Sequence, residues 1–311
     1  MKVIFFGTPE FAKHFLEALH EDADISIEAV VTQTDKPTGR KKILTPSPVK
    51  IFAAENKIPV FQPEKKGDLL PLFKGELEGV ITDIDAFVVV AYGKLIPQTV
   101  LDLPKLGTIN VHPSKLPQYR GPSPMQAAIV NQDKKTAVSI MLLDADMDHG
   151  PILAQQSVLI AKNETLESLQ RKAVQCGAPL LAETLKKLDK GLITPQEQDH
   201  NTATYCDMLS RDDGRIDWNE TAEQIFAKFR AYHPWPGLWT TWNGKRVKFS
   251  MVQIEPGTQS PGTVALQDDK ITVGTGEGLF VTKKLQIEGQ QEASVSDIAK
   301  GHSDLNGASF Q

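Results

Sequence analysis

Asn110 and His112 stand two residues apart at the end of an apolar segment, and their side chains suit chemistry on a carbonyl group. Side chains two positions apart on a β-strand point to the same face, so this spacing brings the amide and the imidazole together. An amide can donate a hydrogen bond to a developing oxyanion, and an imidazole can move a proton near neutral pH. The pair therefore indicates acyl transfer. The alternative is that His112 makes an ordinary polar contact.

A second polar cluster, Asp144, Asp146 and Asp148, follows the apolar segment 138–143. These carboxylates invite a calcium site, but the EF-hand pattern fails because no Glu stands at its last ligand position. A carboxylate beside an imidazole favours the protonated ring and fixes its tautomer, so Asp148 is the third candidate catalytic residue. The alternative is that Asp148 caps a turn. The 2 cysteines are too few for a cysteine-built zinc site, and we predict no metal.

An opening β-α-β unit begins the scaffold that must position these residues. Residues 3–6 form a continuous apolar run, as expected for a strand covered on both faces. Thr8 and Pro9 then supply a helix cap and a first helical residue, and apolar residues recur at helical spacing from Phe11 to Leu19. The turn holds a single glycine, so the sequence lacks the dinucleotide-binding fingerprint and the P-loop.

Strands and helices alternate up to residue 189, which predicts an α/β fold with a doubly wound, mostly parallel, Rossmann-like sheet. Helices are expected after the cap Ser47 and over 166–188. Further strands are expected at 25–32, 86–91, 108–111, 138–142 and, at the sheet edge, 153–160. Ligands of such sheets bind at the carboxyl ends of strands, so Asn110 and His112 should face that crevice. The long polar loop 33–48 has the length of a functional or disordered loop.

The pattern then changes, so we divide the chain into a catalytic domain (1–189), a polar linker (190–206) and a C-terminal domain (207–311). The last part opens with a helix over 221–232. Five short strands follow, at 238–242, 246–254, 262–266, 271–274 and 279–287. They favour a small OB-like β-barrel, a domain type that often binds oligonucleotides. The 4 Trp residues would fill the barrel core or form a base-stacking platform.

The sequence contains no signal-peptide core and no apolar run long enough to span a bilayer, so we expect a cytoplasmic protein with no membrane partner. The net charge of −5 gives no global attraction to nucleic acid. Any binding of nucleic acid would need a local basic patch.

Several motifs are those of a known family. The chain resembles the methionyl-tRNA formyltransferases from end to end. The motifs are GTPEF (7–11), TQTDKP (32–37) with Gly39 and Arg40, PSPVK (46–50), VVVAYG (88–93), NVH (110–112), SKLP (114–117), RGPSP (120–124), Asp148 with Gly150, RIDW (215–218) and PWP (234–236). The Asn–His–Asp set marks only the wider 10-formyltetrahydrofolate transformylase group. The basic loop and the last two motifs narrow the resemblance to the methionyl-tRNA formyltransferases. The family usually has a leucine where this chain has Lys115, and we expect the backbone of that turn to be retained.

The resemblance implies that 10-formyltetrahydrofolate donates the formyl group and that the α-amine of initiator methionyl-tRNA accepts it. Asn110 would then stabilise the oxyanion, His112 would relay the proton, and Asp148 would pair with His112. No metal is required. The resemblance implies folate contacts from Val90, Ala91, Tyr92, Ser114, Lys115, Leu116, Pro117 and Asp144.

The tRNA would explain the second domain and the basic loop. Residues 207–311 contain 11 Lys and Arg against 14 Asp and Glu, a balance of −3, so RNA contact would need basic side chains gathered on one face. Candidates on that face are Lys228, Arg230, Lys245, Arg246 and Lys248. The loop that contains Arg40, Lys41 and Lys42 resembles the family's insertion into the acceptor arm, with Arg40 as its key contact.

Two other functions compete with this one. Another formyl-folate transferase, acting on a nucleotide-sugar amine or a purine precursor, would share the Asn–His–Asp set, but the basic Arg40–Lys42 loop argues against it. A non-catalytic RNA-binding protein on the same scaffold would not need an intact Asn110, His112 and Asp148. We expect the protein to be a monomer.

Overall fold

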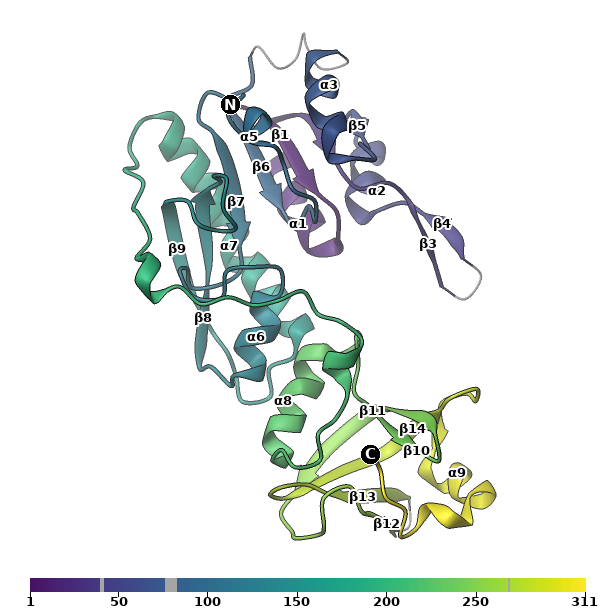
Figure 1. Cartoon of the computed structure of the whole chain (residues 1–311). Coiled ribbons are helices and arrows are strands. Elements are labelled where there is room, and N and C mark those ends of the chain that lie inside the picture. The colour runs from purple at the N-terminus through teal and green to yellow at the C-terminus, as the bar shows by residue number, and fades with distance from the viewer. Residues whose placement is uncertain (40–41, 76–82, 268) are drawn as a thin grey trace. The chain divides into compact units, whose positions relative to one another are not determined.

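The computed structural model describes residues 1–39, 42–75, 83–267 and 269–311 (Figure 1). The chain divides into two compact units. The first comprises Met1–Pro124, Lys135–Leu159 and Leu169–Asp207, and the second comprises Met125–Lys134, Ile160–Ser168 and Met208–Gln311. Of the helices within these described ranges, none has both the length and the apolar character needed to cross a membrane.

A sheet with the strand order β5-β2-β1-β6-β7-β8-β9 forms the centre of the first unit. Its strands are β1 (Lys2–Gly7), β2 (Ser26–Val31), β5 (Val60–Phe61), β6 (Ala86–Val90), β7 (Thr108–His112), β8 (Lys135–Leu142) and β9 (Ile152–Leu159). The strands from β5 to β7 pair in parallel, whereas β8 and β9 pair antiparallel. The predicted doubly wound, mostly parallel sheet is confirmed, with β9 at its edge.

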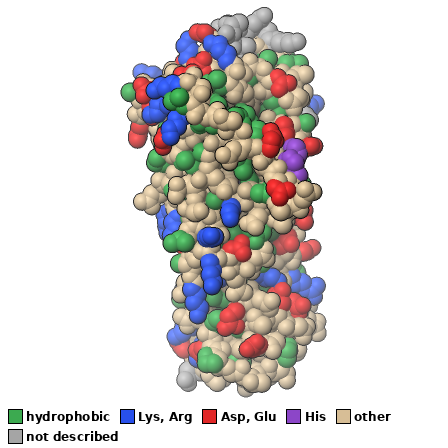
Figure 2. Space-filling view, turned by 90° about the vertical axis from the view of Figure 1, so that its left-hand side faces the viewer, with side chains coloured by type: hydrophobic (Ala, Val, Ile, Leu, Met, Phe, Trp, Pro, Cys, Tyr) green, Lys and Arg blue, Asp and Glu red, His purple; other side chains and the backbone are tan. Residues whose placement is uncertain are grey.

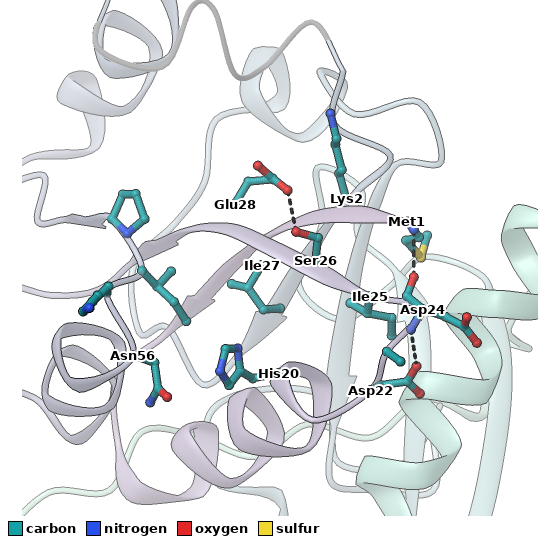
Figure 3. Close-up of a pocket in the computed structure, with 14 residues that line it drawn as sticks. Met1, Lys2, His20, Asp22, Asp24, Ile25, Ser26, Ile27, Glu28 and Asn56 are labelled. Atoms are coloured by element: carbon teal, nitrogen blue, oxygen red, sulfur yellow. Dashed lines mark hydrogen bonds between the residues drawn. The ribbon is translucent and has the colours of Figure 1, made fainter.

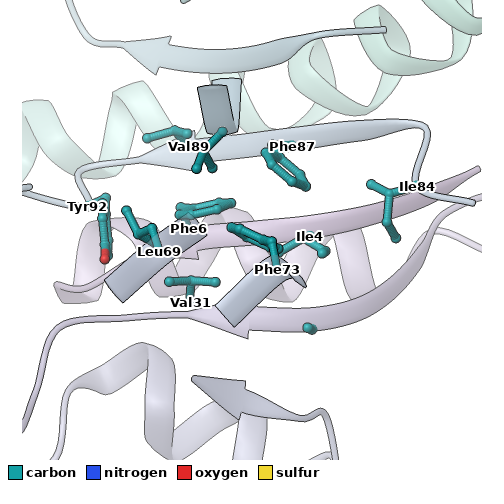
Figure 4. Close-up of a cluster of buried hydrophobic side chains, with 11 residues drawn as sticks. Ile4, Phe6, Val31, Leu69, Phe73, Ile84, Phe87, Val89 and Tyr92 are labelled. Carbon is teal, nitrogen blue, oxygen red and sulfur yellow. The ribbon is translucent and has the colours of Figure 1, made fainter. Parts of the chain in front are cut away.

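Helices cover both faces of this sheet: α1 (Glu10–His20), α2 (Pro48–Glu55), α3 (Leu69–Lys74), the short α5 (Gln98–Leu101) and α7 (Leu166–Asp189). On one face, Leu69 and Phe73 of α3 pack with Phe6, Phe87 and Tyr92 in a buried cluster (Figure 4). On the other face, Gly177 of α7 lies so close to Val138 of β8 that a Cβ would come within 2.9 Å of it. Because helices cover both faces of the sheet, its central strands are buried and carry apolar side chains on both faces.

The amino-terminal turns differ in part from the sequence analysis. The side chain of Ser47 accepts a hydrogen bond from Lys50 N–H at 3.1 Å, which confirms the predicted cap of α2. The predicted Thr8 cap of α1 is wrong, because Pro9 occupies that position and the Thr8 hydroxyl donates to the Tyr92 carbonyl instead. The loop 33–48 has structure of its own, since β3 (Lys36–Thr38) and β4 (Ile43–Thr45) pair as an antiparallel hairpin.

The second unit combines an antiparallel sheet with helices. Its strand order is β10-β11-β14-β13-β12, with β15 paired to β14. The strands are β10 (Trp239–Trp242), β11 (Lys245–Glu255), β12 (Val264–Gln267), β13 (Lys270–Gly274), β14 (Leu279–Ile287) and β15 (Ala293–Ser294), and the helices are α6 (Pro124–Val130), α8 (Ala222–Tyr232) and α9 (Val295–Gly301). The predicted small domain of short β-strands, for which the sequence favours an OB-like barrel, is confirmed as an antiparallel sheet that contains β15 in addition to the five expected strands. Its helix α8 starts at a capping box formed by Thr221 and Gln224.

Most of the tryptophan side chains fill the core of the second unit. Trp218, Trp239 and Trp242 are between 5% and 6% exposed, and Trp218 meets the ring of Phe280 edge to face. Trp235 is 56% exposed. The core interpretation is therefore correct for three of the four residues, and a stacking platform of all four is wrong.

Candidate active site

Asn110 and His112 lie on β7 and are nearly buried, with exposed fractions of 8% and 4%. β7 runs parallel to β6, and Asn110 lies opposite Val89, one residue before the end of β6. Both side chains are therefore held by a central strand, near the carboxyl ends of the parallel strands, where open α/β sheets bind ligands.

Asp148 reaches this pair from the loop between β8 and β9. Because β8 is antiparallel to β7, with Leu142 opposite Ile109, the loop starts beside the beginning of β7 and must fold back. Gly150 permits the fold, since a Cβ there would lie 2.2 Å from the Leu142 carbonyl oxygen. Asp148 itself has a left-handed backbone, with φ at +49°. Asp is one of the few non-glycine residues that adopts this conformation at modest cost.

The Asp148 carboxylate contacts the backbone of Gly121 and the side chains of both His112 and Asn110. Its Oδ2 accepts a hydrogen bond from Gly121 N–H at 2.8 Å and lies 3.5 Å from His112 Nδ1. Its Oδ1 lies 3.4 Å from Asn110 Nδ2. A carboxylate can only accept, so the NH₂ end of the Asn110 amide faces it, and the second N–H of that amide is left for another acceptor. The three predicted catalytic residues thus lie together.

The other ring nitrogen of His112 faces the backbone. His112 Nε2 lies 2.9 Å from the Tyr119 carbonyl oxygen. A carbonyl only accepts, so Nε2 carries a proton in this contact. Nδ1, which faces Asp148, is therefore the nitrogen of the neutral ring that can take up a proton.

The sequence analysis missed the contribution of residues 190–206, which it treated as a linker. Arg120 N–H donates to the Thr204 carbonyl, and Cys206 N–H donates to the Arg120 carbonyl, both at 2.8 Å. A Cβ on Gly121 would lie 2.2 Å from the Cys206 carbonyl oxygen, so only glycine fits where the Gly121 N–H holds Asp148. The polar segment 190–206 has no hydrophobic periodicity that would predict its packing against residues 120 and 121. The only sequence signal was that recognised motifs lie on both sides of it.

The residues expected to contact folate differ in exposure. Ala91 and Lys115 are exposed, Pro117 is half-buried, and the Asp144 side chain is 38% exposed and accepts from His149 Nδ1 at 2.7 Å. Four side chains are buried, those of Val90, Tyr92, Ser114 and Leu116. A ligand at this edge would therefore meet the main chain of those four residues.

Burial also changes the acidity of two side chains near the site. It raises the pKa of the Tyr92 phenol to about 12, and the phenol oxygen makes no hydrogen bond within the described chain. Burial, together with the nearby Asp148 carboxylate, raises the pKa of the Cys206 thiol. Both groups stay protonated near neutral pH, so neither is a nucleophile or a base there.

The residues expected to contact tRNA are only partly available. Arg40 and Lys41 lie outside the described residues, and Lys42 is exposed. On β11, Lys245 and Lys248 are exposed, and Arg246 is half-buried with its guanidinium 4.5 Å from the centre of the Trp239 ring. Two further candidates are engaged elsewhere: Lys228 pairs with Glu220, and Arg230 is buried and donates to the Glu164 carbonyl at 2.8 Å. Placing Arg230 on a basic surface was therefore wrong.

The distribution of surface charge is mixed. On the face shown in Figure 2, Lys and Arg side chains are interspersed with Asp and Glu over most of the surface, and several Lys and Arg side chains lie next to one another near the middle of the view. A shallow groove on the second unit is lined by Arg246, Lys248, Gln286 and Glu288. Because the surface charge is mixed, any binding of RNA would depend on a few basic side chains gathered locally.

A larger depression lies at the other end of the parallel strands. It is lined by the start of β1 and β2 and by the ends of α1 and α2, including Lys2, His20, Ser26 and Asn56 (Figure 3). Because β1, β6 and β7 run parallel, this depression lies at the amino-terminal ends of the strands, whereas Asn110 and His112 lie near the carboxyl ends. Within the described ranges, no three His, Cys, Asp or Glu side chains are grouped so that they could hold a metal ion.

Comparison with known proteins identifies relatives of both units. Residues 1–185 match the family "Formyl transferase", and residues 208–303 match "Formyl transferase, C-terminal domain". The chain is 41% identical to a methionyl-tRNA formyltransferase of Roseiflexus castenholzii over 304 residues, which cover 97% of this chain and 96% of the relative. It is also 41% identical to one of Halalkalibacterium halodurans over 307 residues, covering 97% and 95%.

Solved structures share the fold at low identity. An N-formyltransferase of Helicobacter canadensis in complex with folinic acid and dTDP-3-aminofucose superimposes with a TM-score of 0.65 at 17% identity, over 91% of this chain and 98% of that one. HypX of Aquifex aeolicus in complex with tetrahydrofolic acid gives a TM-score of 0.64 at 16% identity, over 96% of this chain and 47% of that one.

The position of the His112 proton can be measured. Because the Tyr119 carbonyl can only accept, we expect nitrogen NMR of the neutral His112 ring to show the proton on Nε2 and a bare Nδ1. The signals are assigned by their loss in His112→Asn. A neutral ring with its proton on Nδ1 would contradict the geometry.

Proposed function

The chain belongs to the methionyl-tRNA formyltransferase family, and we propose that Asn110, His112 and Asp148 carry out its reaction. That reaction is the transfer of a formyl group from 10-formyltetrahydrofolate to the α-amino group of methionyl-tRNA, which provides the initiator for protein synthesis. The observation that carries the proposal is the convergence of the Asn110 and His112 side chains, with the Gly121 amide, on the Asp148 carboxylate.

Asn110 would stabilise negative charge on the formyl oxygen. Its amide has one N–H turned to Asp148 and a second N–H available to an oxyanion. Such a donor is typically worth about 3–4 kcal/mol of transition-state stabilisation when it is held in place beforehand. The strand position of Asn110 and its contact with Asp148 provide that preorganisation.

His112 would move the proton. Its Nδ1 can accept a proton from the attacking amine, and the Asp148 carboxylate 3.5 Å away stabilises the resulting imidazolium. His112 then returns the proton to the leaving nitrogen. The Tyr119 carbonyl keeps the ring in one orientation throughout.

The residues at the strand ends fit the formyl donor, which supplies the transferred one-carbon group. The side chains of Tyr92 and Ser114 are buried, so we assign them main-chain contacts with the folate, and the exposed Ala91 and the partly exposed Asp144 would offer further contacts. Val90, Lys115, Leu116 and Pro117 complete the set that we propose for the folate.

For the tRNA we propose contacts from Arg40, Lys41, Lys42, Lys245, Arg246 and Lys248. Arg246 and Lys248 are two residues apart on β11, on the face opposite to the buried Val247 and Phe249. The guanidinium and ammonium groups on one face would attract phosphates despite the acidic balance of the whole chain.

Methionyl-tRNA is favoured over a sugar amine as the acceptor. The relatives at 41% identity are methionyl-tRNA formyltransferases, whereas the likeness to the Helicobacter canadensis enzyme extends to the fold alone. We also propose that the protein acts as a monomer in the cytoplasm, since one chain supplies all three residues and the acceptor is used in protein synthesis.

Replacing either reacting group should nearly abolish turnover. We expect His112→Ala and Asn110→Ala to lower kcat by about 100-fold or more in a formylation assay with 10-formyltetrahydrofolate and methionyl-tRNA. The far-ultraviolet circular dichroism should match that of the parent.

Asn56→Ala is a matched control for the asparagine, because it removes an exposed amide at the opposite edge of the sheet. Its turnover should equal that of the parent. Near-normal turnover of His112→Ala or Asn110→Ala would remove that residue from the mechanism.

Arg40 should contribute to the binding of methionyl-tRNA and not to the binding or hydrolysis of 10-formyltetrahydrofolate. We expect Arg40→Ala to lose about 1–3 kcal/mol of productive tRNA binding, seen as a fall in kcat/KM for methionyl-tRNA. The slow hydrolysis of 10-formyltetrahydrofolate, which depends on Asn110 and His112, should be unchanged. Arg40→Lys should rescue poorly, because lysine lacks the planar fork.

The control for Arg40 is Arg211→Ala, which removes an exposed arginine outside the loop and should leave both rates unchanged. The Arg40 hypothesis fails if formylation persists in Arg40→Ala, or if formylation and donor hydrolysis fall together by one factor.

A further inference from the structure

A buried glutamine, Gln198, connects Asp148 to a buried arginine, Arg120. The two side chains are 5% and 1% exposed. Gln198 Oε1 accepts from Nε and Nη2 of Arg120, at 3.2 and 2.8 Å. Gln198 Nε2 donates to the carbonyl oxygens of Asp148, at 3.0 Å, and Gly150, at 2.7 Å. Both ends of the amide are therefore used inside the protein.

Arg120 determines which way the Gln198 amide points. A guanidinium has only donors, so the amide oxygen must face it and the NH₂ must face the two carbonyls. Arg120 is itself fixed, because Nη2 also donates to His200 Nδ1 at 2.8 Å and Nη1 lies 3.4 Å from Tyr205 Oη. The charge of Arg120 thus turns the NH₂ of Gln198 toward the Asp148 and Gly150 carbonyls, which are both acceptors.

The Asp148 loop needs such a donor. Asp148 has φ at +49°, a conformation that costs a non-glycine residue free energy and persists only where the surroundings hold it. The Gln198 amide binds the carbonyl of Asp148 and that of Gly150, and so restrains the backbone on both sides of His149. The Asp148 side chain, in turn, is aimed by that backbone at His112 and Asn110.

We propose that Gln198 is a positioning residue, oriented by Arg120, that holds the backbone of Asp148 so that its carboxylate meets His112 and Asn110. The inference rests on the proposed function, because it concerns the group that aligns His112. The two contacts that it protects are long, at 3.5 and 3.4 Å, so a shift of the loop of about 1 Å would break them. Gln198 touches no reacting atom and acts only through Asp148.

Gln198→Glu tests this with little change of shape. The glutamate keeps the acceptor for Arg120 and forms an ion pair with it, but it loses both donors and places a carboxylate against two carbonyl oxygens. We expect kcat for formylation to fall by about tenfold or more, with KM for methionyl-tRNA within about twofold of the parent. Hydrolysis of 10-formyltetrahydrofolate should fall by the same factor as kcat. Gln259→Glu is the matched control, because its amide donates to a carbonyl, that of Thr263, in the second unit.

The decisive measurement repeats Gln198→Glu in an Asp148→Asn background. If Gln198 acts through Asp148, the added substitution should cost less than about threefold there. An equal loss in both backgrounds, an unchanged kcat in the single variant, or a rise in KM with kcat unaffected would overturn the proposal. Urea unfolding of Gln198→Glu separates a positioning effect from a loss of folded protein.

The proposed function is tested separately by the parent enzyme. A parent that forms no formyl-methionyl-tRNA refutes the proposed acceptor. Hydrolysis of 10-formyltetrahydrofolate by the parent, Gln198→Glu, Asp148→Asn and the variant with both substitutions still decides whether Gln198 acts through Asp148.

Discussion

The hydrogen bonds and charge of one carboxylate, that of Asp148, hold the site together. The carboxylate accepts from the Gly121 amide, faces the Asn110 amide and faces the His112 imidazole, so it connects three separate segments of the chain. Its side chain is only 13% exposed, and in such surroundings electrostatic interactions are stronger than in water. Removing the carboxylate altogether would leave its neighbours without a common partner.

Strands and loops have different tasks around this carboxylate. β7 carries Asn110 and His112, the proposed catalytic pair, on a buried strand, where their spacing is fixed by the backbone. The irregular segments carry the groups that align them: the Tyr119 carbonyl, the Gly121 amide and Gln198. This arrangement lets the chemistry sit on the stable part of the sheet, while the close approaches that need glycine or a left-handed backbone are confined to loops.

Local patterns predicted the parts of the fold that local physics decides. The apolar run of β1, the Ser47 cap and five of the six strands of the second unit depend on neighbouring residues. The sequence could not show that β8 is antiparallel to β7, because strand direction depends on long-range pairing. It also could not show that Arg230 is buried or that 190–206 packs on 119–121, since polar residues with distant partners leave no periodic signal. Asn110, His112 and Asp148 could be proposed as catalytic residues because their chemistry, and the motifs around them, are distinctive, and the structure brings the three side chains together.

The dependence of formylation rate on pH, measured for the parent and for Asp148→Asn, tests the central claim most directly. Asparagine keeps the size of the side chain and an acceptor for the Gly121 amide, but it removes the charge that stabilises the protonated His112 ring. The account predicts that the remaining activity of Asp148→Asn has its acid limb at lower pH than that of the parent. An unchanged acid limb, with turnover near that of the parent, would contradict the pairing of Asp148 with His112.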